Sequence, residues 1–61
     1  MLAIERRQEI MTLIQKEKSV RVHHLATQYN VTEETIRRDL DKLDKEGKVT
    51  KTYGGAVLEN P

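Results

Sequence analysis

The chain has 61 residues and a net charge of +1; 36% of its residues are hydrophobic, 34% are charged, and it has no Cys, Phe or Trp. A chain of this length folds as a single domain, because it buries only about 60% of the surface that it exposes when unfolded. The lack of Cys excludes disulfides, cysteine-based zinc sites and thiol nucleophiles, and it suits the cytoplasm, where we expect the protein. The longest apolar run, Met1–Ile4, is far shorter than the ~18 residues of a membrane span, so we expect no membrane partner.

The first predicted element is an amphipathic helix from about Ala3 to Glu17. Its apolar positions recur at helical spacing and comprise Ile4, Ile10, Met11, Leu13 and Ile14. The segment Val20–Val22 then alternates apolar and polar residues, as a very short strand does.

A second helix of about two turns is predicted over His23 to Tyr29. Leu25, Ala26 and Tyr29 fall at i, i+1 and i+4, so they can face one core. Asn30 follows, and Asn readily adopts the left-handed conformation that ends a helix. The sequence therefore predicts a tight turn at Asn30.

A third helix is predicted to begin after Thr32, which suits the N-cap position. Glu33 and Glu34 in its first turn interact favourably with the positive end of the helix dipole. Val31 and Ile36 have the spacing of a hydrophobic staple, which fixes the angle at which the chain enters a helix.

One side of this third helix is apolar and the opposite side is basic. The apolar side carries Ile36, Leu40 and Leu43. At about 100° per residue, the opposite side carries Arg38, Lys42 and Lys45. Asp41 lies four residues from both Arg37 and Lys45, so we expect part of the positive charge to be paired. Gly47 supplies the residue that ends the helix.

After Gly47 the pattern changes to the alternation of a strand over Val49–Tyr53, and Ala56–Leu58 forms a second β-rich run. Gly54 and Gly55 are predicted to turn the chain between them into a hairpin. The predicted fold is mainly α with a small β-hairpin wing: a winged helix-turn-helix of three helices and a short antiparallel sheet.

This arrangement presents the front of the third helix to the major groove of double-stranded DNA. Arg can bond O6 and N7 of guanine, Thr can meet a thymine methyl group or a phosphate, and Glu can accept from a cytosine amine. The predicted DNA-binding residues are Thr32, Glu33, Glu34, Thr35, Arg37, Arg38 and Lys42 of the helix, with Lys51, Tyr53 and Gly54 of the wing.

A wider set of positions forms a specific pattern: Leu25-Ala26, Tyr29, Val31-Thr32, Thr35-Ile36-Arg37-Arg38-Asp39-Leu40, Leu43, Gly47, Val49 and Tyr53-Gly54-Gly55-Ala56. It resembles the amino-terminal DNA-binding domain of the DeoR family of bacterial transcriptional regulators, over about residues 3–58. Two departures are mild: Tyr53 stands where the family commonly has His, and Val49 where Leu or Ile is common.

The resemblance implies a DNA-binding domain at 3–58, with a helix-turn-helix motif at about 20–39 and a wing at about 51–57. It implies a repressor of sugar or nucleoside genes that binds an operator half-site. It also implies that residues 59–61 begin a linker to a carboxy-terminal domain, which binds a phosphorylated sugar and makes the full-length protein a homo-oligomer. The isolated chain is then expected to be a monomer that binds DNA weakly.

Several alternatives weigh against these assignments. A winged helix can also serve as a protein-docking or dimerisation module without DNA, and a basic side opposite an apolar stripe is typical of any solvated helix. Tyr53 can instead pack on its own strands, and Lys51 can be an edge-strand lysine that discourages aggregation. Adjacent His23 and His24 point about 100° apart on a helix, so we expect no metal site; we also expect no cofactor and no enzymatic activity.

Overall fold

The structure is a computed structural model that describes residues 1–59. In chain order it contains α1 (Ala3–Glu17), β1 (Ser19–Arg21), α2 (Val22–Tyr29), α3 (Glu33–Lys45), β2 (Val49–Thr52) and β3 (Gly55–Leu58). The predicted fold of three helices with a small antiparallel sheet is confirmed. Of the linker predicted at 59–61, only Glu59 lies within the described residues. Within residues 1–59, no helix has the length and apolar character that a membrane crossing requires.

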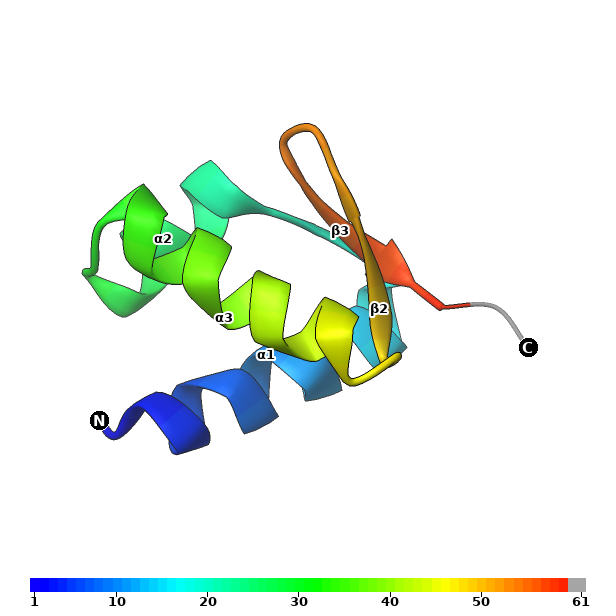
Figure 1. Cartoon of the computed structure of the whole chain (residues 1–61). Helices are drawn as coiled ribbons and strands as arrows, with labels where there is room; N and C mark the ends of the chain where they lie inside the picture. The colour runs from blue at the N-terminus through cyan, green and yellow to red at the C-terminus, as the bar shows by residue number, and fades with distance from the viewer. Residues whose placement is uncertain (60–61) are drawn as a thin grey trace.

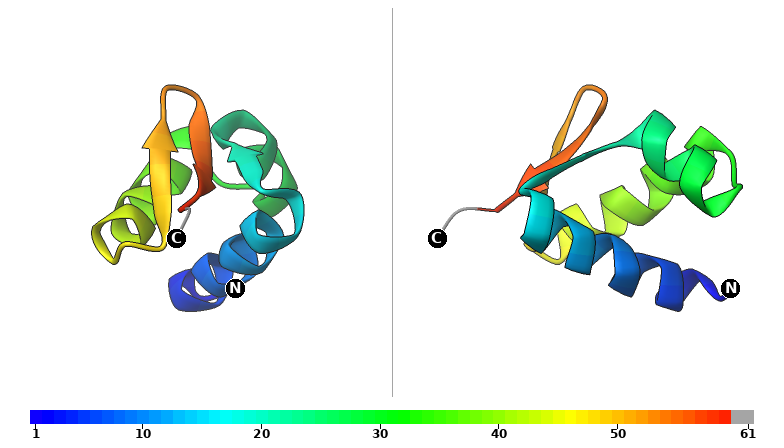
Figure 2. Two further views of the ribbon diagram at one scale, coloured as in Figure 1. Left: turned by 90° about the vertical axis from the view of Figure 1, so that its right-hand side faces the viewer. Right: turned by 180° about the vertical axis from the view of Figure 1, so that it is seen from behind.

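The three helices form the body of the molecule and the sheet closes one end of it (Figure 1). α3 lies between α1 and α2, and the β2–β3 hairpin rises away from α1 (Figures 1 and 2). The hairpin tip and the start of α2 therefore lie on the side of the molecule opposite α1.

The sheet has the strand order β1-β3-β2, and both pairs are antiparallel. Two boundaries differ from those predicted: Val22 opens α2 rather than closing β1, and the hairpin turn is formed by Tyr53 and Gly54 rather than by Gly54 and Gly55. Gly55 is already the first residue of β3, where it pairs with Arg21 on one side and Thr52 on the other.

The core is aliphatic and receives residues from every element. Its buried members are Ile10, Ile14, Val20, Val22, Leu25, Ala26, Ile36, Leu40, Leu43, Val49 and Ala56. Met11 and Leu13 pack at its edge, whereas Ile4 is 57% exposed and is no part of the stripe that we predicted. Ile4 is exposed because it lies about 120° from Ile10 around the axis of α1, away from the side that packs into the core.

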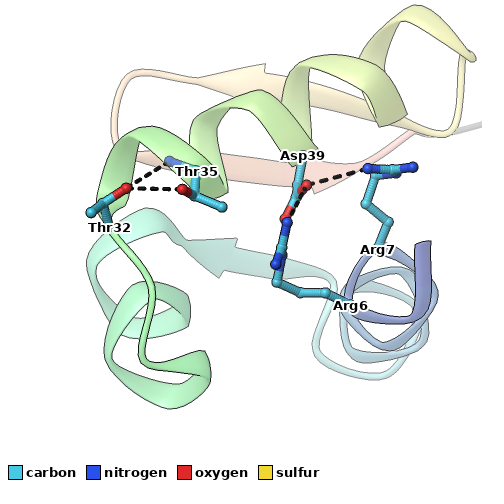
Figure 3. A network of polar contacts seen from close by, with 5 residues as sticks. All are labelled: Arg6, Arg7, Thr32, Thr35 and Asp39. Carbon is cyan, nitrogen blue, oxygen red and sulfur yellow. Dashed lines mark hydrogen bonds and ion pairs between the residues drawn. The ribbon is translucent and has the colours of Figure 1, made fainter. Parts of the chain in front are cut away.

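The turn between α2 and α3 has the predicted geometry. Asn30 is left-handed at φ 55°, and its amide donates to the carbonyl of Ala26. Thr32 is the N-cap of α3, and its Oγ1 accepts from the amide of Thr35 at 3.1 Å. The two threonine hydroxyls are also hydrogen-bonded at 2.9 Å (Figure 3). Gly47 ends the helical segment at φ 76°.

We expect Thr32→Ala to lower the free energy of unfolding by about 1 kcal/mol, because the alanine leaves an amide at the start of α3 without its acceptor. Urea unfolding followed by circular dichroism measures this loss. Thr32→Ser keeps the hydroxyl and should retain most of the stability; equal losses in both variants would show that the cap is not the cause.

Candidate nucleic-acid interface

The helical residues predicted to bind DNA lie at the start of α3 and along its exposed side. Thr32, Glu34, Arg37, Arg38 and Lys42 are exposed, while Glu33 and Thr35 are half-buried. The outer face of α3, as we use the term, consists of Glu34, Arg37, Arg38, Asp41, Lys42 and Lys45, which together line a shallow surface depression. The opposite side of the helix packs into the core.

Most basic side chains of this outer face are paired with carboxylates of the same helix. Arg37 Nη2 lies 3.0 Å from Oε1 of Glu33, and Arg38 Nη2 lies 3.0 Å from Oε2 of Glu34. The expected pairing of Arg37 with Asp41 is wrong, because Arg37 turns toward the amino end of α3 instead. An exposed i,i+4 pair of this kind is weak, so it holds the arginine in place without preventing exchange for another anion.

Asp41 forms two ion pairs toward the carboxyl end of the outer face. It pairs with Lys45 at 3.1 Å, as expected, and with Lys51 of β2 at 3.2 Å. The hydrogen bonds from Lys45 and then Lys51 hold the pKa of Asp41 below its ordinary value. Lys42 is exposed and makes no ion pair within residues 1–59, so it can bind an external anion without leaving a partner.

Lys51 fastens the wing to α3 through both its main chain and its side chain. Its amide donates to Oδ2 of Asp44 at 2.9 Å, while its Nζ reaches Asp41. Both acceptors lie on α3, so strand β2 is held against that helix. Lys51 lies on the edge strand β2, and its two contacts place the wing beside the outer face.

The tip of the wing is attached to the start of α2. The carbonyl of Gly54 accepts from the amide of Val22 at 2.9 Å, which satisfies one of the amides that a helix start leaves free. Tyr53 beside it is fully exposed, so the alternative in which this ring packs on its own strands is wrong. The wing tip thus presents an aromatic ring and a glycine to solvent.

His23, the second residue of α2, joins this surface to α3. Its Nδ1 lies 3.1 Å from Oε2 of Glu33, the carboxylate whose other oxygen is paired with Arg37. The hydrogen bond from His23 and the charge of Arg37 lower the pKa of Glu33. Our sequence reasoning missed this contact, because a ten-residue separation across a turn carries no local signal.

Among residues 1–59, Asp39 is the one charged residue that is buried. It is 3% exposed, and its carboxylate is bound by Arg6 and Arg7 of α1 (Figure 3). Arg6 uses Nε and Nη2 on the two oxygens of Asp39, and this hydrogen bonding raises the pKa of Arg6. The sequence held a signal that we missed: Asp39 lies only about 60° from Ile36 around α3, beside the apolar stripe.

Comparison with known proteins assigns the chain to a family. DeoR-like helix-turn-helix domains match residues 6–61. The HTH-type transcriptional regulator YulB of Bacillus subtilis (strain 168) is 51% identical over 57 residues, covering 93% of this chain and 22% of that protein. The putative aga operon transcriptional repressor of Escherichia coli O157:H7 is 41% identical over 54 residues, covering 88% and 20%.

The lactose phosphotransferase system repressor of Staphylococcus epidermidis (strain ATCC 12228 / FDA PCI 1200) is 42% identical over 52 residues, covering 85% of this chain and 21% of that protein. The chain thus spans about a fifth of the length of the curated relatives that it matches. No solved structure gives a significant match. With a family match that extends over residues 6–61 and a helix-turn-helix followed by a wing, the chain belongs to the DeoR-like helix-turn-helix family of DNA-binding transcriptional regulators, which are not enzymes.

Proposed function

We propose that residues 3–58 form the unit that reads an operator half-site, with α3 in the major groove and the wing beside it. The observation that carries this proposal is the outer face of α3, which is exposed, rich in arginine and lysine, and held beside the wing by Lys51. The motif then occupies about residues 20–39 and the wing about 51–57. Arg37 and Arg38 are the base-reading residues of this proposal, supported by Thr32, Thr35 and Lys42.

Binding then requires an exchange of partners. Arg37 and Arg38 are held by Glu33 and Glu34 in the free protein, and each must leave its carboxylate to reach a guanine or a phosphate. The released carboxylates then lie in the groove, where a glutamate can accept from a cytosine amine. Because this exchange costs an ion pair for each arginine and the net charge is only +1, we expect the isolated chain to bind weakly.

For the whole protein we propose a repressor of sugar or nucleoside genes that works in the cytoplasm. The roles of two relatives, in the aga operon and in a lactose phosphotransferase system, support the sugar assignment. A carboxy-terminal domain that binds a phosphorylated sugar and drives oligomerisation would supply the control. Dimerisation would place two copies of α3 on adjacent half-sites, as two-fold operators require.

A proton–nitrogen NMR titration with a mixed-sequence duplex tests DNA binding directly. We expect amide shifts to cluster over residues 32–42 and 51–55 at ~50 mM salt and to fade at ~200 mM, because phosphate contacts release counterions. A silent spectrum at low salt would instead favour the rival function, a winged helix that docks another protein without contacting DNA.

Arg38→Ala is expected to weaken binding to a duplex selected from a random library by about 1–3 kcal/mol and to relax the preference at one base pair. Arg38 is chosen because it is exposed and points away from the core. Lys16→Ala is the matched control, since Lys16 is an exposed basic residue of α1, the helix that lies on the side of the molecule opposite the wing tip (Figure 1). Fluorescence anisotropy measures both; unchanged affinity in a folded Arg38→Ala variant would remove Arg38 from the site.

A further inference from the structure

His23 stands where α2, α3 and the wing tip come together, and the proposed function leaves its imidazole unused. The side chain is 86% exposed, and Nδ1 is engaged by Glu33 at 3.1 Å. The second ring nitrogen, Nε2, has no hydrogen-bond partner among residues 1–59. One nitrogen of the ring is thus anchored to α3, and the other is open to a ligand on the same surface.

The anchoring contact sets the chemistry of the open nitrogen. Glu33 is an acceptor, so Nδ1 carries the proton and donates it. In the neutral ring Nε2 then holds a lone pair, which repels an anion, whereas in the protonated ring Nε2 becomes a donor that can bind one. An ordered anion opposite Nε2 therefore favours the protonated ring.

The charged and titratable groups around His23 come from β1, α2, α3 and the wing. α3 contributes Glu33 and, through that carboxylate, Arg37. Arg21 and His24 flank His23 along the chain, and the wing contributes Tyr53, because Gly54 next to it is bonded to the start of α2. Of these groups, Glu33 is the one hydrogen-bonded to the imidazole, and its lowered pKa keeps it ionised across the pH range in which histidine titrates.

From this geometry we propose that His23 is a DNA-phosphate contact that takes up a proton when the duplex binds, so that affinity for DNA rises as the pH falls through the histidine range. The inference rests on the proposed function, because it places the same surface on a DNA backbone. It adds a contact from α2 to those of α3 and the wing.

The direction of the pH dependence follows from the charges. In the free protein the imidazolium has one anionic neighbour, Glu33; in the complex it has two, Glu33 and the phosphate. The complex therefore holds the proton more tightly than the free protein does, and linkage requires the protonated protein to bind DNA more tightly. A contact that raises the titration midpoint of an imidazole by one pH unit gives about tenfold tighter binding at low pH.

Fluorescence anisotropy with a mixed-sequence duplex of about 20 base pairs, at ~50 mM salt between about pH 5.5 and 8.5, tests the proposal. For the unaltered chain we expect binding to tighten about tenfold from the alkaline to the acidic end, following the titration of one group. Titration calorimetry in two buffers of different ionisation enthalpy should show uptake of up to one proton per bound chain near pH 7.

Three variants locate the effect. His23→Gln keeps a hydrogen-bonding side chain that cannot be protonated, and it should bind with little pH dependence at the alkaline affinity. His23→Lys is charged throughout the range and should bind tightly at both ends. His24→Gln removes the neighbouring exposed histidine and should behave as the unaltered chain; circular dichroism verifies that each variant is folded.

The possible outcomes distinguish the proton uptake by His23 from DNA binding itself. Binding that tightens on acidification equally in His23→Gln would overturn the inference, since the effect would come from His24 or the terminal amino group. Binding by the unaltered chain at a constant affinity would overturn the inference and leave the proposed function standing. Absence of binding at every pH, at low salt, would overturn the proposed function itself.

Discussion

Gly55→Ala is expected to destabilise the protein by about 3 kcal/mol, the upper part of the range for inserting an atom into a packed interior. Gly55 lies in the middle strand, where its missing side chain lets β1 pass close by. A Cβ atom at this position would overlap the carbonyl oxygen of Val20 and lie 2.9 Å from its carbonyl carbon. Both are backbone atoms, so no side-chain rotation relieves the overlap and the strands themselves must move apart.

The adjacent glycine provides the control for this experiment. A Cβ atom on Gly54 would meet nothing within 4 Å. Gly54→Ala should therefore change the free energy of unfolding by less than about 1 kcal/mol, mainly through the unfolded chain. Urea and thermal unfolding measure the loss of stability in both variants. Equal losses of stability would mean that the hairpin turn, rather than the approach of β1 to β3, requires glycine.

Asp39→Asn is expected to lower the free energy of unfolding by about 3–5 kcal/mol, because removing one member of a buried charge group leaves its partners uncompensated. Asp39 is 3% exposed, and Arg6 and Arg7 both point at its carboxylate. A domain of this size has a total stability of roughly 3–9 kcal/mol, so this loss is a large fraction of the total and the variant should unfold at a much lower temperature.

Asp41→Asn is the matched control, since it makes the same chemical change two residues along α3, where the ion pairs are exposed. Its unfolding midpoint should move much less than that of Asp39→Asn, because solvent screens exposed pairs. A double-mutant cycle of Arg6→Ala and Asp39→Ala adds a second check. Strictly additive losses in that cycle would show that the two side chains do not stabilise the fold through each other.

The buried ion pairs of Asp39 with Arg6 and Arg7 also fix the orientation of α3. Asp39 lies on the inner side of α3, next in the chain to Arg38 on the outer face. Arg6 and Arg7 hold it to α1, while Lys51 holds the wing to the outer face through Asp41 and Asp44. α3 is therefore fixed to α1 on one side and to the wing on the other, which sets the angle at which its exposed residues meet a ligand.

The sequence alone determined the elements of this protein. Ile10 and Ile14 at helical spacing predicted a helix from about Ala3 to Glu17, where α1 lies, and Thr32 with Gly47 marked the two ends of α3. Asn30 marked the turn between the two later helices. These features can be predicted from the sequence because helical periodicity, helix caps and left-handed turns depend on residues within one or two helical turns of each other.

Only the tertiary structure decided which side chains meet. Gly55 needs to be glycine because β1, more than thirty residues earlier, passes beside it, and Asp39 is paired because α1 packs on α3. The contact of His23 with Glu33 likewise depends on how the turn places α2 against α3. Such contacts depend on distances between elements that no local pattern encodes. The sequence therefore predicted the residues that we propose to read DNA, but not the ion pairs and hydrogen bonds that hold them in place.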